Sequence, residues 1–147
     1  MNIKRIIVKN NQRTYNLEIE EDNGFYKIVC LSPELTEMGC VMFKLNTKSC
    51  WLYKIKTEEA FQRQGIGSQL LTIMEKIALE NNINFIEGKF YPENAYARSF
   101  YEKNGYYVPN KTRDWNEYDD SWTLCKLLNK EETKQFLANE IIEEKNI

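Results

Sequence analysis

The fold is decided by residues 54–82, which read KIKTEEAFQRQGIGSQLLTIMEKIALENN. The stretch begins with an alternating, β-leaning run, and its second half carries apolar residues at helical spacing. These are Ile66, Leu70, Met74, Ile77 and Ala78. Between strand and helix lies a short turn with Gly65 and Gly67. The first N–H groups of a helix have no internal partner, and the helix dipole adds partial positive charge beside them. Strand, glycine turn and helix N-terminus together predict a pyrophosphate site.

Several phosphate-binding loops place glycines before a helix, and their spacing distinguishes them. A Walker loop would end in Gly-Lys-Ser/Thr, which is not found here. A dinucleotide-binding fingerprint would need a third glycine where this chain has Leu70. The remaining pattern is Gln-x-x-Gly-x-Gly, at residues 62–67. It resembles the acyl-CoA pyrophosphate loop of the GNAT superfamily of N-acyltransferases.

A second signature lies downstream at residues 94–106, which read NAYARSFYEKNGY. It resembles the GNAT pattern N-x-x-A-x-x-F-Y-E-K-x-G-[FY], and it follows a strand expected at residues 83–91, where the family places it. An ordinary amphipathic helix with a glycine stop would explain the apolar residues, but it would not need Asn, Tyr and Gly at these offsets. Two motifs in this order indicate a member of the family, with a resemblance over about residues 39–128.

The resemblance implies an α+β fold, a strongly twisted mixed β-sheet flanked by helices, as a single domain over residues 1–147. Alternating runs predict strands at residues 3–8, 14–20, 25–31, 40–45 and 50–56, and a closing pair at 106–108 and 121–127. The family usually has two helices after its first strand, and here a β-hairpin replaces them. A capping-box pattern at residues 129–132 predicts an extra helix over about residues 130–144, within a C-terminal extension at 129–147.

The resemblance also implies acetyl-CoA as the co-substrate. Its pyrophosphate would accept hydrogen bonds from the backbone N–H groups of residues 63–68. Its pantetheine arm would lie along residues 55–57 in the manner of an added strand. The family more often has arginine where this chain has Gln62, and Arg63 could supply that charge. The implied cofactor-binding residues are Ile55, Lys56, Thr57, Gln62, Arg63, Gln64, Gly65, Ile66, Gly67, Ser68, Asn94 and Tyr101.

Acyl transfer from a thioester to an amine needs one group to take a proton from the amine and another to protonate the departing thiolate. The chain has no histidine, which excludes Ser-His-Asp and Cys-His machinery and most zinc sites, and no metal is expected. Tyr101 matches the family's general acid, since a phenol with a pKa near ~10 is protonated at neutral pH. The alternative role for Tyr101 is core packing beside Phe100. Glu87 is the candidate base, directly or through water, and the alternative is a surface or structural glutamate.

Charge and hydropathy limit the partners. The formal net charge of -2 argues against nucleic acid, and no apolar run approaches the ~18–20 residues that span a membrane. The first residues do not resemble a signal peptide, so a cytoplasmic enzyme is expected. The expected activity is direct N-acetylation of a primary amine of a small molecule, peptide or protein. The alternative is a non-catalytic acyl-CoA-binding module with a regulatory or interaction role.

Two segments outside the motifs are candidates for the acceptor side. Residues 109–120 are aromatic and mostly acidic, so Trp115 and Tyr118 could bind a cationic acceptor, unless the segment is only a solvated hairpin loop. The expected C-terminal helix has a narrow apolar stripe at Phe136, Leu137 and Ile141. An exposed stripe predicts a homodimer in which this segment helps to close the site; the alternative is a monomer whose last helix folds back.

Overall fold

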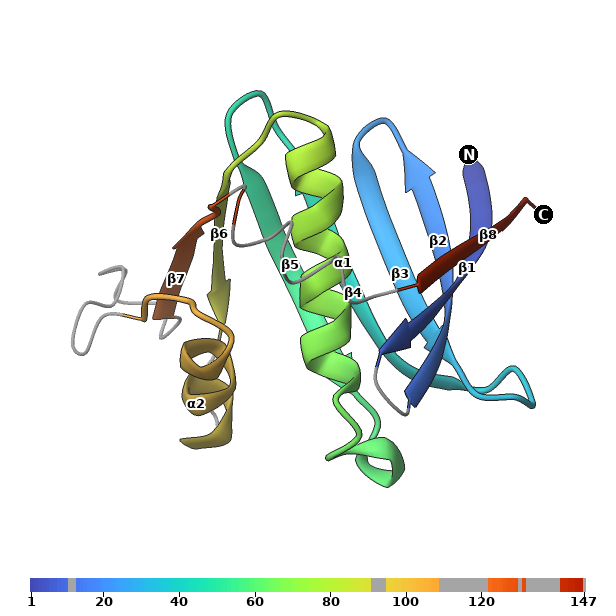
Figure 1. Ribbon diagram of the computed structural model, residues 1–147. Helices are drawn as coiled ribbons and strands as arrows, with labels where there is room; N and C mark the ends of the chain where they lie inside the picture. The colour runs from blue at the N-terminus through green and yellow to red at the C-terminus, as the bar shows by residue number, and fades with distance from the viewer. Residues whose placement is uncertain (11–12, 91–94, 109–121, 130, 132–140, 147) are drawn as a thin grey trace.

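The computed structural model describes residues 1–10, 13–90, 95–108, 122–129, 131 and 141–146 (Figure 1). Its body is an eight-stranded sheet in the order β7-β6-β5-β4-β3-β2-β1-β8. The strands are β1 (Asn2–Asn10), β2 (Arg13–Asp22), β3 (Phe25–Leu31), β4 (Glu37–Leu45), β5 (Cys50–Thr57), β6 (Phe85–Phe90), β7 (Trp122–Leu127) and β8 (Ile141–Asn146). The helical elements are η1 (Glu59–Phe61), α1 (Ile66–Glu80) and α2 (Ala95–Lys103). Strands β5 and β6 pair in parallel, and the other neighbours pair antiparallel.

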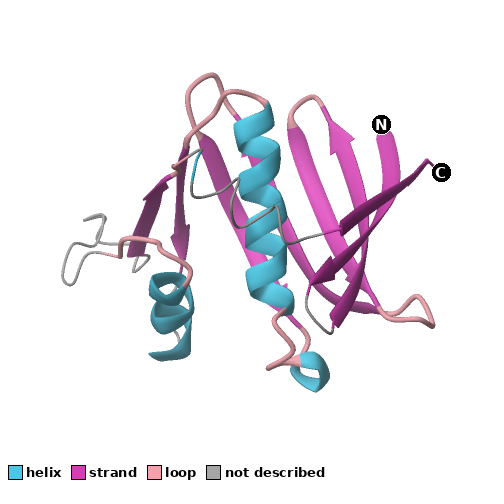
Figure 2. Cartoon of the chain, in the orientation of Figure 1, coloured by secondary structure: helices cyan, strands magenta, loops and turns pink. Residues whose placement is uncertain are grey.

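One face of the sheet is buried because apolar side chains occupy every second position of its strands. Side chains of a strand point to opposite faces in turn, so every second residue of β2 to β5 reaches the same face. The fully buried residues on that face include Leu17, Ile28, Val41, Phe43 and Leu52. Helix α1 lies along β3, β4 and β5 and buries Leu70, Leu71 and Met74 in the same core (Figure 2). The other face carries no helix within the described part of the chain.

The expected fold class is confirmed, including the hairpin in place of two helices. β1 and β2 pair antiparallel from Asn2↔Glu21 to Asn10↔Arg13. The inward residues of this hairpin join the main core; they are Ile6, Val8, Tyr15, Leu17 and Ile19. The hairpin is therefore packed as part of the domain. No helix of the described residues is both long and apolar enough to cross a membrane.

The prediction of a C-terminal helix is wrong for its last residues, from 141 onward. Ile141–Asn146 form β8, which pairs antiparallel with β1 from Lys9↔Ile141 to Lys4↔Asn146. The capping pattern is a local signal, whereas the free edge of β1 offers unpaired N–H and C=O groups to any extended segment that reaches it. Residues 130 and 132–140, with Phe136 and Leu137, lie outside the described residues. The homodimer stays a prediction, and Ile141 no longer supports it, since it belongs to a strand of its own sheet.

The parallel pair of strands opens where it approaches α1. β5 and β6 are paired at only three positions, which end at Leu52↔Gly88. A bulge on β5 follows at once, because Met42 pairs with Lys54 and Phe43 with Leu52, so that Tyr53 is the extra residue. An added Cβ at Gly88 would lie 2.7 Å from the carbonyl oxygen of Leu52, so glycine lets the strands meet closely before they separate. The sheet thus has a gap at the carboxyl ends of its parallel strands, where ligands of such sheets commonly bind.

Candidate active site

A cavity of about 680 Å³ lies beside the end of β5, the N-terminus of α1 and one side of α2. The structure brings most of the expected cofactor-binding residues together in its walls. These are Ile55, Lys56, Thr57, Gln62, Arg63, Gly65, Ile66, Gly67, Ser68 and Tyr101. Gln64 is not among the lining residues, and its carbonyl accepts a hydrogen bond from Tyr15. Asn94, Trp115 and Tyr118 lie outside the described residues.

The glycine loop presents unpaired backbone donors to this cavity. Gln69 donates the first helical hydrogen bond of α1 to the Gly65 carbonyl, at 3.0 Å. The N–H groups of residues 65–68 have no protein acceptor within the described part of the chain. The positive end of the α1 dipole lies at the same place. Unpaired donors and a helix N-terminus at a cavity wall fit a bound diphosphate.

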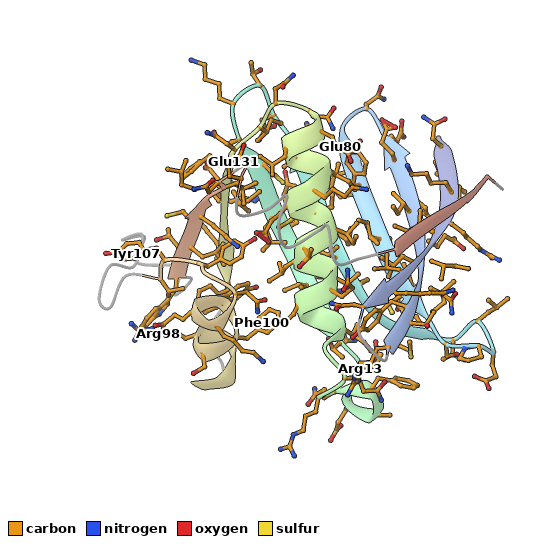
Figure 3. The ribbon with its side chains drawn as sticks, in the orientation of Figure 1. Arg13, Glu80, Arg98, Phe100, Tyr107 and Glu131 are labelled. Atoms are coloured by element: carbon orange, nitrogen blue, oxygen red, sulfur yellow. The ribbon has the colours of Figure 1, made fainter. Side chains whose placement is uncertain are left out.

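Glycine at position 67 allows the two helices to approach each other. An added Cβ on Gly67 would lie 2.9 Å from two ring carbons of Phe100, and 3.6 Å from the Thr57 hydroxyl oxygen. Real Cβ atoms do not tolerate the first distance, so any other residue would displace Phe100. Figure 3 shows the Phe100 ring pointing from α2 toward the N-terminal end of α1. Gly67 therefore sets the width of the cavity at the loop.

Tyr101 enters the cavity wall from α2. Its side chain is 6% exposed and packs on Phe90, Phe100 and Tyr106, with ring centroids 4.9, 5.4 and 6.0 Å away. Burial raises the pKa of Tyr101 to about 12. Within the described part of the chain its hydroxyl makes no hydrogen bond, although the residue lines the cavity. The phenol is therefore protonated at every physiological pH and can donate to a group bound in the cavity.

Glu87 lies on the other side of the sheet from Tyr101. Ile86 and Phe90 of β6 are buried in the core with Tyr101, so Glu87 belongs to the opposite face by alternation. It pairs with Trp51 of β5, one position before the last pair at the gap, and it is not among the cavity-lining residues. The structure places the two expected catalytic residues on opposite faces of the sheet, beside the same gap. The role of Glu87 as a base stays a prediction.

Four further residues of α2 line the cavity that were not expected to bind the cofactor. They are Ala97, Ser99, Phe100 and Lys103. Ser99 and Lys103 are four residues apart and lie on one helix face, so the spacing within the second signature was a usable signal. The amine of Lys103 adds positive charge to the wall of the cavity that also contains the glycine loop. The described residues contain no group of three or more Cys, Asp or Glu side chains placed to hold a metal ion.

A largely buried ion pair ties the far end of α2 to α1. Lys126 of β7 places its Nζ 2.5 Å from the Glu75 Oε1 of α1 and donates to the Asn104 carbonyl at 2.9 Å. The same Nζ lies 5.3 Å from the centre of the Tyr106 ring. The Glu75 and Lys126 side chains are 9% and 25% exposed. Burial raises the pKa of Glu75, and the hydrogen bond and charge of Lys126 oppose this rise.

Replacing Lys126 by methionine should lower the free energy of unfolding by about 3 kcal/mol, because Glu75 would be left buried without a partner. A raised pKa means that the stability contributed by Glu75 is full below the ordinary value of 4.5 and is lost as the pH rises. Without Lys126 the pKa rises further, so the variant should lose more stability than the wild type between about pH 4 and pH 8. Urea unfolding at both pH values measures the free energy of unfolding of each protein.

Lys76→Met is the control, because it removes a more exposed ion pair with Glu80, and it should lower the free energy of unfolding by less than ~1 kcal/mol. Equal losses in the two variants would contradict the expectation.

The sequence profile of the acetyltransferase (GNAT) family matches residues 7–106. This match begins inside β1 and ends before β7. It therefore includes most of the N-terminal third of the chain, which was expected to lie outside the resemblance. No curated protein sequence matches the chain.

Solved structures of acetyltransferases share the fold. One is the PaiA N-acetyltransferase of Thermoplasma acidophilum in complex with coenzyme A, with 21% identity over 69% of this chain and 59% of that chain, at a TM-score of 0.59. A GNAT acetyltransferase of Staphylococcus aureus Mu50 gives 20% identity over 73% of this chain and 70% of that chain, at 0.63. Ard1 of Thermoplasma volcanium gives 17% identity over 73% and 72%, at 0.61.

The family match covers more than half of the chain, and the sheet, the loop and the two helices agree with it. GNAT enzymes take the acetyl group from acetyl-CoA, and the unpaired N–H groups at the start of α1 suit its diphosphate. This chain therefore belongs to the GNAT family of acetyltransferases, with acetyl-CoA as its co-substrate.

Proposed function

We propose that this chain transfers the acetyl group of acetyl-CoA directly to a primary amine of a small molecule, a peptide or a protein. One observation carries the proposal. The unpaired N–H groups of residues 65–68 and the protonated, buried Tyr101 line the same cavity. One wall suits the diphosphate of the donor, and the other offers a proton donor for its sulfur.

The residues that would hold acetyl-CoA are inferred from their places in the cavity wall. The N–H groups of residues 65–68 would bind the diphosphate, and Arg63, Lys56 and Lys103 would add positive charge around it. β5 continues to Thr57 after its pairing with β6 has ended, so within the described part of the chain residues 53–57 have backbone groups without a strand partner on that side. An amide-containing arm could pair there as an added strand does.

Tyr101 would act on the sulfur of the donor. As the amine nitrogen forms its bond to the acetyl carbon, the carbon–sulfur bond breaks and the electron pair stays on sulfur as a thiolate. The Tyr101 hydroxyl would donate a hydrogen bond to this charge from the cavity wall. With a pKa raised to about 12, the phenol is a weaker acid than a thiol of ordinary pKa near ~8.5. Tyr101 would therefore stabilise the developing thiolate, and solvent would restore any proton that it transfers.

The acceptor amine would approach from the other face of the sheet. A primary amine such as that of lysine, with a pKa near ~10.4, arrives charged and must lose a proton before it attacks. Glu87, beside the gap on that face, is the candidate base, directly or through water. The Trp51 and Tyr53 rings lie 6.3 Å apart on the neighbouring strand, and aromatic faces attract ammonium groups. Because the strands separate beyond Gly88, groups on the two faces could reach one thioester.

The test is release of CoA thiol from acetyl-CoA in the presence of separate classes of amine. Polyamines, aminoglycosides and peptides with free α- or ε-amines form the panel, with a no-amine reaction as the background. We expect one class to accelerate release and to gain the mass of an acetyl group. If acetyl-CoA binds but no amine raises the rate above background, the proposed transfer to these amines is wrong and a non-catalytic acyl-CoA-binding module is favoured.

A further inference from the structure

The N-terminal hairpin makes a direct contact with the glycine loop. Tyr15 of β2 is 7% exposed and belongs to the main core. Its hydroxyl donates a hydrogen bond of 2.9 Å to the carbonyl oxygen of Gln64. The strand that replaces the usual N-terminal helices thus reaches the residue next to the helix cap of α1, which is Gly65.

The orientation of one peptide group decides where the Gly65 N–H points. The peptide bond between residues 64 and 65 is planar and trans, so the Gln64 carbonyl and the Gly65 N–H point in opposite directions. Tyr15 holds the carbonyl, and the N–H is therefore directed away from Tyr15. Gly65 lines the cavity and Gln64 does not, which agrees with an N–H that faces the cavity.

The backbone conformation of the loop does little to hold this peptide group in one orientation. Gly65 has a φ of 75°, and glycine adopts positive and negative φ with similar ease, so a reversed peptide meets little steric resistance there. Arg63 has a φ of 68°, a left-handed conformation that is unfavourable for a residue with a Cβ. Within the described part of the chain, the Gln64 carbonyl accepts a hydrogen bond from the Tyr15 hydroxyl and from no backbone N–H group.

The contact also depends on glycine at position 65. An added Cβ there would lie 3.0 Å from the Tyr15 hydroxyl oxygen, which is closer than ordinary van der Waals contact. The same glycine that permits the left-handed turn lets the hydroxyl reach the loop. Tyr15 and Gly65 therefore form one unit, although they come from different halves of the domain.

We propose that Tyr15 is a positioning residue for acetyl-CoA. Its hydroxyl holds the peptide between residues 64 and 65 in the orientation that aims the Gly65 N–H at the diphosphate. The inference rests on the proposed function, since it assigns the anion site at the start of α1 to acetyl-CoA. It gives the hairpin a part in cofactor affinity in addition to its place in the core.

Tyr15→Phe tests this, because it keeps the ring in the core and removes only the donor. The dissociation constant for CoA should rise about three- to tenfold, the range expected for one lost hydrogen bond. The KM for acetyl-CoA should rise by a similar factor, and kcat at saturation should stay unchanged. S-acetylpantetheine lacks the diphosphate, so its KM should not change. Thermal unfolding of the variant shows that it is folded.

Tyr26→Phe is the matched control. Tyr26 of β3 stacks on Phe43 with ring centroids 5.0 Å apart, and its hydroxyl makes no hydrogen bond in the described part of the chain. This variant should bind CoA as the wild type does. If Tyr15→Phe leaves CoA affinity unchanged, or weakens S-acetylpantetheine as much as acetyl-CoA, the positioning role is wrong. Failure of the wild type to bind CoA would instead overturn the proposed function, and this inference with it.

Discussion

Replacing Gly67 by glutamate should abolish binding of acetyl-CoA, with a loss of affinity of about 100-fold or more. The new carboxylate would lie at the N-terminus of α1, where it would take up the unpaired N–H groups itself and repel a diphosphate. It would also crowd Phe100, whose ring lies 2.9 Å from the position of an added Cβ. Calorimetric titration of the folded variant with CoA measures the effect.

A second pair of variants separates charge from crowding. Ser68 lines the same cavity in the first turn of α1, where a glutamate is favourable for the helix. Ser68→Glu and Ser68→Gln introduce side chains of nearly equal size, and only the first carries a negative charge. We expect Ser68→Glu to bind CoA far more weakly than Ser68→Gln. Unchanged affinity in folded Gly67→Glu, or equal affinities in the Ser68 pair, would remove the diphosphate from this loop.

Tyr101→Phe should lower turnover by about 10²–10⁴-fold while acetyl-CoA still binds, since only the proton donor is lost. The ring contacts with Phe90, Phe100 and Tyr106 do not involve the hydroxyl and should persist. Burial raises the pKa of Tyr101 to about 12, so the wild-type phenol stays protonated throughout an assay from about pH 6 to pH 10. The ratio of the two kcat values should therefore be nearly constant across that range.

The control for Tyr101 is Tyr107→Phe, which removes a hydroxyl from a side chain that is 66% exposed and does not line the cavity. It should leave kcat unchanged. A Tyr101→Phe variant with normal kcat at saturation but weaker binding of acetyl-CoA would make Tyr101 a packing residue. Measuring kcat and KM separately for both variants distinguishes these results.

Local patterns accounted for the central part of the fold. The glycine turn, the helix at residues 66–80 and the strands before it were predictable because alternation and helical periodicity act over neighbouring residues. The hairpin in place of two helices was visible for the same reason. Most residues expected at the donor site meet in one cavity because the loop and the strand end that carry them adjoin each other in the chain.

Local patterns did not predict which segment pairs with the edge of the sheet, or that Glu87 and Tyr101 lie on opposite faces of it. The segment at residues 141–146 became β8, since the open edge of β1 can pair with it and a capping pattern carries no information on that edge. Glu87 and Tyr101 flank one gap from opposite faces, which depends on how β6 sits in the sheet and not on its own sequence. Lys126 meets Glu75 only after β7, α1 and the end of α2 have packed together.

The family, a phosphate-binding loop and a candidate acid could all be predicted from the sequence, because these predictions depend on residue types at fixed short spacings. Three features follow only from the packed chain: which backbone donors stay unpaired among the described residues, how deeply Tyr101 is buried, and which side chain bonds to the loop. Tyr15 illustrates the physical reason, since its hydrogen bond to the Gln64 carbonyl joins residues far apart in the chain. Such contacts form when the packing of the whole sheet offsets the entropy of closing the chain between them, and short-range patterns do not record that balance.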